Sequence, residues 1–564
     1  MTFDLLPAMD DYEACRRDVR LEIPDDFNFA WDVVGQHARQ RGDDVAFIAV
    51  PTDGPPRPVT FGAFDDAAAR VARGLLRLGL NPGDRVLSMI PRIPAFYEAM
   101  IGAMKVGVVS MPGTNLLTSN DIAYRLRASG AKAVIVTAEH ADKVDAIRAQ
   151  CPSLELSILI GADRPGWTRF ETLLATAEPL ERSEAPVTRA TDTMLVYFTS
   201  GTTAHPKMVA RDFAYGLAHA LTGKYWMALR PGDVHWTLTD TGWAKAAWGL
   251  VFPPWLMGAT TVLFEGGGKF DVPTHLSLIE TLGVTSFCAP PTVYRLFAQH
   301  DLGGFDASRL RRSLSAGEPL NPEVIRVWKD ATGHAPADGY GQTETVNLVA
   351  NFPGVSLRPG SMGKPVPGLD VRVVDAQGRE VGPNEVGNIA VRLPTVDGRT
   401  ANPDPKAAEP WPLGLFRGYE SEDGDRSAYF HHGHYFTGDT ATRDEDGYIW
   451  FVGRADDVIS SAAYRISPFE VESALQEHPA VAEAAVVAKP DALRGHIVVA
   501  FIVLAAGHGA SDALASEIQQ HVKTTTAPYK YPREIYFREQ LPKTISGKIR
   551  RVQLRAQAQA MVKP

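Results

Sequence analysis

The sequence has few of the features that mark secreted or metal-bound proteins. Its only cysteines are Cys15, Cys151 and Cys288, which are too widely spaced to suggest a metal site. Their odd number argues against a disulfide framework, so a reducing compartment is expected. The first residues also lack the basic segment and the apolar stretch of a signal peptide. We therefore predict a cytoplasmic location.

Basic clusters, repeats and unbroken membrane-length segments are missing as well. The net charge is −9 and no block of Lys and Arg occurs, so nucleic acid is not an expected partner. No short repeat or low-complexity tract is found, which argues against a solenoid. One uncharged run, Ala246–Phe264, is long enough to span a membrane, but Pro253, Pro254 and Gly258 interrupt it. We predict a buried helix, a turn and a buried strand there instead of a membrane span.

What the chain does contain is an alternation of short apolar strands with helices. Its 564 residues are enough for two to four domains. Strands are expected at Arg85–Ile90 and Ala133–Thr137, and a helix at Phe64–Leu80. Residues 1–60 look polar and irregular, apart from a helix near Phe29–Arg41. The alternation predicts an α/β fold in which parallel or mixed sheets are sandwiched between helices.

The predicted pattern of strands, helices and turns changes twice towards the C-terminus. Short strands separated by Gly and Pro turns predict a β-rich subdomain at residues 355–451. The segment after Gly453 has its own helix and strands and predicts a small α+β domain. We therefore divide the chain into an N-terminal lobe (1–453), a hinge (454–456) and a C-terminal lid domain (457–564).

One stretch, Tyr197–Val209, combines a strand with a polar loop. The apolar run Met194–Phe198 predicts a buried strand, which then leads into hydroxyl side chains, a glycine and Lys207. Such a loop offers backbone N–H groups, hydroxyl donors and a cation, which together suit a polyphosphate. It is not a Walker loop, because Pro206 disfavours a helix through the lysine. An ordinary polar surface loop is the alternative.

Three further motifs carry groups that suit a nucleotide. In Asp338–Thr345, Tyr340 can stack on a base, and Glu344 is an oxygen ligand suited to Mg²⁺, although a lone glutamate is normally a solvated surface residue. Asp439 follows a turn and can accept ribose hydroxyls. Ser315–Pro319 offers small residues beside which a flat ring can lie, or it is an ordinary strand-to-helix turn. The trio His431, His432 and His434 lacks the spacing of a metal site.

In their order along the chain, these motifs resemble those of the adenylate-forming superfamily. The segment Thr239–Lys245 is similar to the medium-chain acyl-CoA synthetase branch of that superfamily. The resemblance covers about residues 30–555. It implies a large lobe with a mobile C-terminal domain, and a reaction in which a carboxylic acid and ATP with Mg²⁺ give acyl-AMP and pyrophosphate before CoA accepts the acyl group.

The resemblance also assigns individual residues. It implies catalytic roles for Lys548, Thr343 and Glu344, with Glu344 as the Mg²⁺ ligand and Asp456 as the hinge. The implied acyl pocket comprises Trp243, Lys245 and Gly341, and the implied CoA tunnel comprises Ser461, Ala462, Ala463, Tyr464 and Arg465. The residues expected to bind ATP or AMP are Thr199, Ser200, Gly201, Thr202, Thr203, Lys207, Gly317, Glu318, Pro319, Asp338, Gly339, Tyr340, Gly341, Gln342, Thr343, Asp439 and Arg454.

The sequence departs from the family pattern at several glycines. Ala204 replaces a glycine of the phosphate loop, and Ala463 and Ser467 replace two glycines of the segment that faces CoA. An added methyl group in a packed tunnel would hinder a thread-like ligand, so weakened thioester formation is expected. Conversely, acetate-specific relatives carry tryptophan at the place of Gly341, and glycine is expected to leave a void for an acyl group larger than acetyl.

Two other functions are consistent with the motifs. One is the adenylating half-reaction alone, with a bulky acyl-AMP passed to a partner ligase or a carrier protein; it would give acyl-AMP but little acyl-CoA. The other is a catalytically silent nucleotide-binding scaffold, which would bind ATP without releasing pyrophosphate; Lys548, Glu344 and Asp439 argue against it. A homodimer is the expected oligomer on general grounds.

Overall fold

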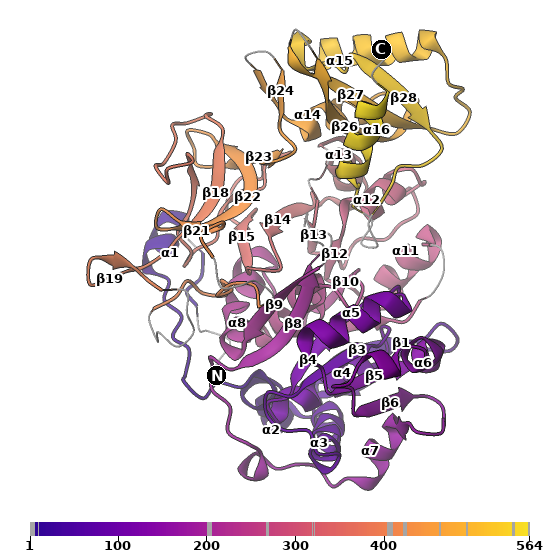
Figure 1. Ribbon diagram of the computed structural model, residues 1–564, viewed down its shortest axis with the longest axis vertical. Helices are drawn as coiled ribbons and strands as arrows, with labels where there is room; N and C mark the ends of the chain where they lie inside the picture. The colour runs from indigo at the N-terminus through magenta and orange to yellow at the C-terminus, as the bar shows by residue number, and fades with distance from the viewer. Residues whose placement is uncertain are drawn as a thin grey trace.

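The computed structural model describes residues 6–9, 11–199, 206–266, 270–318, 320, 322–402, 410–420, 426–461, 464–491, 494–543 and 548–561. Figure 1 shows a large lobe that contains most of the chain. A smaller C-terminal sheet lies at one end of the molecule, above this lobe in the view. The large lobe is built on two sheets, and a third sheet lies beside them.

A seven-stranded sheet takes up the first part of the large lobe, in the order β7-β6-β5-β3-β4-β8-β9. Its pairings are parallel except for the hairpin of β8 and β9. Helices α5 (Ser119–Ser129) and α6 (Ala138–Asp145) pack against one face through apolar side chains such as Ile122 and Val144. The strands are β3 (Arg85–Met89), β4 (Val109–Pro112), β5 (Ala133–Thr137), β6 (Leu156–Ile160), β7 (Thr168–Arg169), β8 (Thr193–Thr199) and β9 (Lys207–Asp212).

A nine-stranded sheet forms the second part, in the order β16-β15-β14-β13-β12-β10-β11-β1-β2. Its central strands are parallel, and the pairings at both edges are antiparallel. Helices α11 (Val272–Thr281), α12 (Pro291–Ala298) and α13 (Pro322–Thr332) cover its outer face. The strands are β1 (Val45–Val50), β2 (Arg57–Thr60), β10 (Val234–Thr237), β11 (Thr260–Phe264), β12 (Ser286–Ala289), β13 (Arg312–Ala316), β14 (Ala337–Gly341), β15 (Asn347–Ala350) and β16 (Lys364–Pro365).

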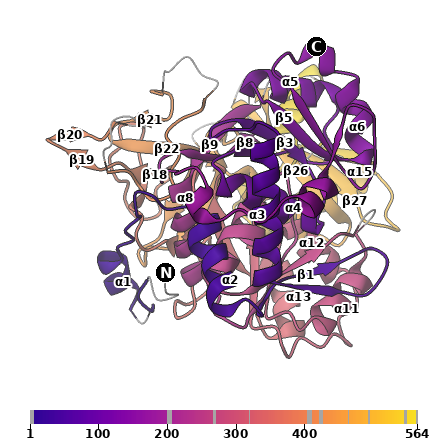
Figure 2. The ribbon, with the colours of Figure 1, turned by 90° about the horizontal axis from the view of Figure 1, so that it is seen from below.

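A layer of helices lies between the two sheets and shares the largest apolar core with both. Figure 2 shows its long helices, α3 (Phe61–Arg77) and α4 (Pro94–Lys105), between α5 and α6 on one side and α11 and α13 on the other. Gly102 lets the two long helices approach closely, because a Cβ there would lie 2.8 Å from Val71 Cγ1. The other helices of the lobe are α1 (Tyr12–Asp18), α2 (Gly35–Arg41), α7 (Phe170–Thr176), α8 (Phe213–Ala218) and α9 (Ala244–Ala246).

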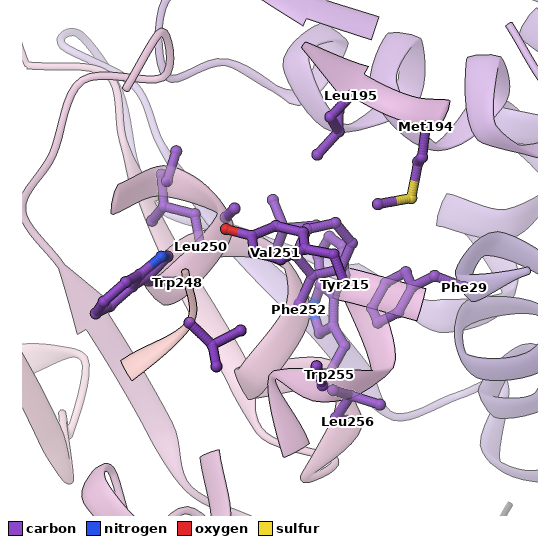
Figure 3. Close-up of a cluster of buried hydrophobic side chains, with 14 of the residues drawn as sticks. Phe29, Met194, Leu195, Tyr215, Trp248, Leu250, Val251, Phe252, Trp255 and Leu256 are labelled. Atoms are coloured by element: carbon purple, nitrogen blue, oxygen red, sulfur yellow. The ribbon is translucent and has the colours of Figure 1, made fainter. Parts of the chain in front are cut away.

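The uncharged run Ala246–Phe264 is part of this buried layer, as predicted. It forms a π-helical turn (Ala247–Val251), then helix α10 (Phe252–Leu256), and it ends in β11. Figure 3 shows its side chains in the core, where the ring of Phe252 meets that of Phe29 edge-on at 4.8 Å. Among the described residues, none of the helices is both long enough and apolar enough to cross a bilayer.

The β-rich part and the C-terminal part each form a separate sheet. The first is an antiparallel sheet of β17 (Val371–Val374), β18 (Gly387–Arg392), β21 (Phe430–His431), β22 (His434–Arg443) and β23 (Ile449–Arg454). The second contains β26 (Val481–Asp491), β27 (Gly495–Leu504) and β28 (Glu534–Arg538), with α14 (Pro468–Gln476) and α15 (Asp512–Thr525) on one face and α16 (Arg551–Ala560) on the other. Small hairpins are made by β19 (Thr395–Val396) with β20 (Arg399–Thr400) and by β24 (Ile459–Ser461) with β25 (Tyr464–Ile466).

The predicted fold class is confirmed, with one error near the N-terminus. Residues 1–60 are not irregular: Val45–Val50 forms β1, which pairs in parallel with β11 inside the nine-stranded sheet. The helix near Phe29–Arg41 is confirmed as a π-helical turn followed by α2. The domain boundaries at residues 453 and 457 stay a prediction.

Candidate active site

The site lies where the carboxyl ends of the two large sheets face each other. Strands β12, β13 and β14 end side by side at Ala289, Ala316 and Gly341. Across from them, Thr114 follows β4 of the other sheet, and its hydroxyl donates to Asp240 Oδ2 at 3.0 Å after β10. The carboxyl edge of a parallel sheet is the usual place for a ligand, because loops of several strands converge there.

The predicted phosphate loop connects the paired strands β8 and β9. Its two ends, Thr199 and Lys207, are paired across the hairpin, and Lys207 begins a strand rather than a helix. The hydroxyl of Tyr124, on α5, donates to the Pro206 carbonyl at 2.9 Å and fixes the exit of the loop. The expected contacts of Ser200, Gly201, Thr202, Thr203 and Ala204, like those of Pro319, Ala462 and Ala463, lie outside the described residues.

The motif after β13 and β14 provides buried polar groups for a nucleotide. Burial raises the pKa of the Asp338 carboxyl to about 7, although the Gly339 N–H at 3.0 Å and the charge of Lys245 act in the other direction. Thr343 follows in a tight turn that the amide of Gln342 closes by donating to the Thr345 hydroxyl at 3.0 Å. Directly after the neighbouring strand β13, Gly317 has a φ of +111°, a conformation that glycine adopts readily.

Asp439 is at the centre of a second polar group, contributed by β14, the turn after it, β22 and β23. Its carboxylate Oδ2 accepts from the Tyr340 hydroxyl at 2.6 Å and from Gln342 Nε2 at 2.8 Å, while Oδ1 faces Arg454 Nε at 3.9 Å. Asp439 is only 6% exposed, and burial raises its pKa. The structure therefore brings Tyr340, Gln342, Asp439 and Arg454 together, with Oδ1 directed away from the two strong protein donors.

Glu344, the predicted metal ligand, is held by residues that the sequence motifs did not indicate. Its Oε1 accepts from the Tyr419 hydroxyl at 2.6 Å, and its backbone carbonyl accepts from Arg211 at 2.8 Å. At 8% exposure it is not the solvated surface residue that was the alternative. A single buried carboxylate fits Mg²⁺ that is shared with substrate phosphates, because Mg²⁺ is usually bound through one or two carboxylates. In the described part of the chain, no cluster of three acidic, His or Cys residues could hold a metal alone, and the His431–His434 trio forms none.

The predicted acyl pocket needs one correction. The space beside Gly341 is not a void, because the indole of Trp248 fills it: a Cβ on Gly341 would lie 2.2 Å from Trp248 Cη2. A small cavity does lie next to the indole, lined by Trp226, Met227, Thr237, Lys245, Trp248, Gly249, Cys288 and Ala316. Of the predicted pocket residues, Lys245 borders this cavity, whereas Trp243 directly precedes the short helix α9 and does not line the cavity. Trp248 was missed because its contact with Gly341 joins segments that are far apart in the chain.

The C-terminal part brings two more predicted groups to the site. Burial lowers the pKa of Lys245, and the charge on Lys548 lowers it further; the same charge opposes the burial that raises the pKa of Asp439. Lys548 is thus within electrostatic reach of both the acyl cavity and the nucleotide carboxylate. Arg551 donates to both carboxylate oxygens of Glu472 at 2.7 Å, and this pairing raises the pKa of Arg551 against its burial. The charges of Asp457 and Glu318 add to the effect.

The predicted CoA face is a separate surface. Ser461 and Tyr464 lie on the β24–β25 hairpin, and the half-exposed ring of Tyr464 stacks on Tyr529 with centroids 4.0 Å apart. Ser467 has an ordinary structural reason to replace glycine, because its hydroxyl caps α14 by accepting from the Glu470 amide at 3.2 Å. Asp456 faces Arg454 at 3.6 Å, at the place predicted for the hinge.

The site has the features of an adenylate-forming enzyme: a buried carboxylate at Asp439, a lysine at the end of a hairpin loop, and Lys548, whose charge acts on Asp439. The chain belongs to the AMP-binding enzyme family: residues 34–397 match the model of that family, and residues 470–548 match the model of the AMP-binding enzyme C-terminal domain. This confirms the family that the motifs predict.

Known relatives extend over nearly the whole chain. It is 40% identical over 554 residues to mitochondrial acyl-coenzyme A synthetase ACSM3 of Mus musculus (96% of this chain, 93% of that one). It is 43% identical over 560 residues to mitochondrial ACSM4 of Rattus norvegicus (98% and 93%). Among solved structures, the anthranilate CoA ligase AuaEII with anthranoyl-AMP has a TM-score of 0.84 at 31% identity (95% and 98%). A benzoate CoA ligase from Burkholderia xenovorans LB400 has a TM-score of 0.77 at 28% identity (94% and 100%).

The position of Asp439 gives a first test of the nucleotide site. Asp439→Asn keeps the shape of the side chain but removes the charge that would strengthen hydrogen bonds from ribose. Hydrogen bonds to charged groups are worth about 1.5–3 kcal/mol, so we expect the KM for ATP to rise by roughly 30-fold, with a smaller change in kcat. Steady-state kinetics at varied ATP concentrations measure this change in KM. The control is Asp444→Asn, because Asp444 directly follows the strand β22 that contains Asp439. An unchanged KM would place the ribose elsewhere.

Proposed function

We propose that the protein catalyses the ATP-dependent activation of a carboxylic acid to acyl-AMP, followed by transfer of the acyl group to CoA. The proposal is supported by the buried carboxylate of Asp439, which accepts hydrogen bonds from Tyr340 and Gln342. The charge of Lys548 acts on this carboxylate and on Lys245, which lines the small cavity. The family and the acyl-CoA synthetase relatives support the same reaction.

The first step joins two anions, so charge neutralisation and alignment are its main requirements. An oxygen of the substrate carboxylate attacks the α-phosphorus, and the bond from that phosphorus to the bridging oxygen breaks to release pyrophosphate. Lys548 would neutralise the carboxylate and the α-phosphate, and Lys207 with the phosphate hairpin would hold the leaving group. Asp439 would fix the ribose, and Thr343 would donate to the α-phosphate. The substrate is the nucleophile, so no side chain is acylated.

In the second step the CoA sulfur attacks the acyl carbon, the thiol proton is lost, and AMP leaves with the electrons of the acyl–oxygen bond. Tyr464 and Ser461 lie on the β24–β25 hairpin, whereas Lys548 lies just before α16. Use of both groups in turn would require the C-terminal part to rotate between the steps. Mg²⁺ held by Glu344 would neutralise phosphate charge when bound. The hinge at Asp456, a dimer, a partner ligase or carrier protein, and the cytoplasmic location stay predictions.

The acyl group is proposed to be larger than acetyl. The cavity next to the Trp248 indole is lined by two tryptophans and a cysteine, which suits an apolar group. Its volume of about 10 Å³ is only that of a water molecule, so binding of an acyl chain or ring would require Trp248 to move. The size of the cavity is set by Trp248 rather than by residue 341 itself, since the indole already occupies the space where a side chain at 341 would lie.

A screen of aliphatic and aromatic acids of increasing size tests the function. We expect acid-dependent pyrophosphate release that requires Mg²⁺, and equimolar acyl-CoA and AMP once CoA is added. Measuring acyl-AMP and acyl-CoA separately by chromatography distinguishes full ligation from the half-reaction that Ala463 suggested. ATP binding with no pyrophosphate release from any acid would instead indicate a silent scaffold.

A further inference from the structure

A segment outside the sequence motifs connects the phosphate hairpin to Glu344. We call residues 411–420 the strap. Its Glu420 amide donates to the Met208 carbonyl at 3.1 Å, and Tyr419 pairs with Val209, so the strap lies antiparallel along β9. Near its middle the Phe416 amide donates to the Glu344 carbonyl at 2.8 Å. The strap therefore contacts both sides of the proposed phosphate site.

Tyr419 touches a functional group on each of those sides. Its hydroxyl donates to Glu344 Oε1 at 2.6 Å, and the Lys207 ammonium lies over its ring at 4.5 Å from the centroid. The hydrogen bond is short and its acceptor is charged, as expected for a strong interaction. The position of the Lys207 ammonium over the Tyr419 ring is a cation–π contact, and such contacts are stronger where water is excluded. The Tyr419 side chain thus contacts both the Glu344 carboxylate and the Lys207 ammonium and orients them.

The backbone around Glu344 is fixed independently, which leaves its carboxylate as the variable part. Arg211, only 2% exposed, donates to the Glu344 carbonyl at 2.8 Å and also bonds the Gly414 carbonyl of the strap. With the main chain held in this way, the rotamer of the carboxylate depends on Tyr419. The hydroxyl uses only Oε1, so Oε2 can serve a metal ion without loss of this bond.

We propose that Tyr419 is a positioning residue for the adenylation step, which holds Glu344 for Mg²⁺ and Lys207 for the phosphates in one arrangement. This inference rests on the proposed function. It assigns to the hydroxyl a role in metal-dependent ATP binding, and to the ring a role in metal-independent ATP binding. A purely structural role is the alternative, because the ring also packs against Phe416 and Tyr429.

The test is equilibrium binding of ATP to the full chain by calorimetry, with EDTA and then with excess Mg²⁺. In Tyr419→Phe we expect the Mg²⁺-dependent gain in affinity to fall by about 10-fold, because a hydrogen bond to a charged group is lost. Affinity in EDTA should change by less than about 2-fold, because the ring under Lys207 is kept. Tyr419→Leu should weaken binding in EDTA as well.

Two controls separate positioning from stability. Tyr448→Phe removes a hydroxyl that donates to the Ser356 carbonyl at 2.6 Å, away from the site, and should leave both affinities unchanged. In a Glu344→Gln background, Tyr419→Phe should have no further effect on the Mg²⁺ gain, as expected for coupled residues. A lowered melting temperature with an intact Mg²⁺ gain would overturn the proposal. The binding assay uses no acid, so its outcome is separate from a failure of the acid screen.

Discussion

Lys548→Gln is expected to slow acyl-AMP formation by at least about 100-fold, because a preorganised group that stabilises developing charge is worth roughly this much in rate. The charge of Lys548 reaches both Lys245 and Asp439 in the structure, which is where the carboxylate and the nucleotide would meet. Glutamine keeps a donor of similar length but loses the charge. Single-turnover release of pyrophosphate, measured with saturating acid and MgATP, reports the step directly.

The second half-reaction separates this role from a general loss of structure. Synthetic acyl-AMP and CoA should still give acyl-CoA with Lys548→Gln, because the other face of the C-terminal part is used there. Lys543→Gln is the matched control: it lies in the same segment but pairs with Glu483 at 2.7 Å. Full-speed adenylation by Lys548→Gln would remove the central residue of the proposed mechanism.

The sequence predicted the parts of the site that are local. The motif Asp338–Thr345 begins inside β14 and continues into the turn after it, so its groups lie close together because they are close in sequence. Asp439 was recognised from its own motif, but the turn expected before it is part of β22. Tyr419, Arg211 and Trp248 were not predicted as site residues, because their roles come from contacts with segments far away in the chain.

The two structural errors have different causes. Strand β1 had a signal, the continuous apolar run Val45–Val50, which is typical of a strand buried on both faces; the polar and proline-rich residues around it concealed the run. For the space beside Gly341, the sequence held no signal that another side chain fills it. Whether a missing side chain leaves space depends on what packs there, and the indole of Trp248 comes from a different element.

Changing Trp248 is expected to alter the acids that the enzyme accepts. Trp248→Leu shortens the wall of the cavity and leaves room beside Gly341 for a longer chain. Each buried methylene is worth about 0.8 kcal/mol, so three more would favour longer acids by roughly 60-fold in relative kcat/KM. Leucine is preferred to alanine, because Trp→Ala in a core costs about 3–5 kcal/mol of stability. The measurement is kcat/KM for straight-chain acids of increasing length.

Gly341→Ala, made with Trp248 in place, should reduce the space in the cavity, whereas Trp248→Leu should enlarge it. Its Cβ would lie 2.2 Å from Trp248 Cη2 and 2.5 Å from the Val346 carbonyl, so the indole must move into the cavity. Activity should fall for all acids, and Trp248→Leu should partly restore it in the double variant, because the clash with the indole is relieved. Trp255→Leu, also in the apolar run but packed on Phe64 and Tyr97, should lower the melting temperature without shifting the preferred chain length. If Trp248→Leu left the length profile unchanged, the acyl group would bind outside this cavity.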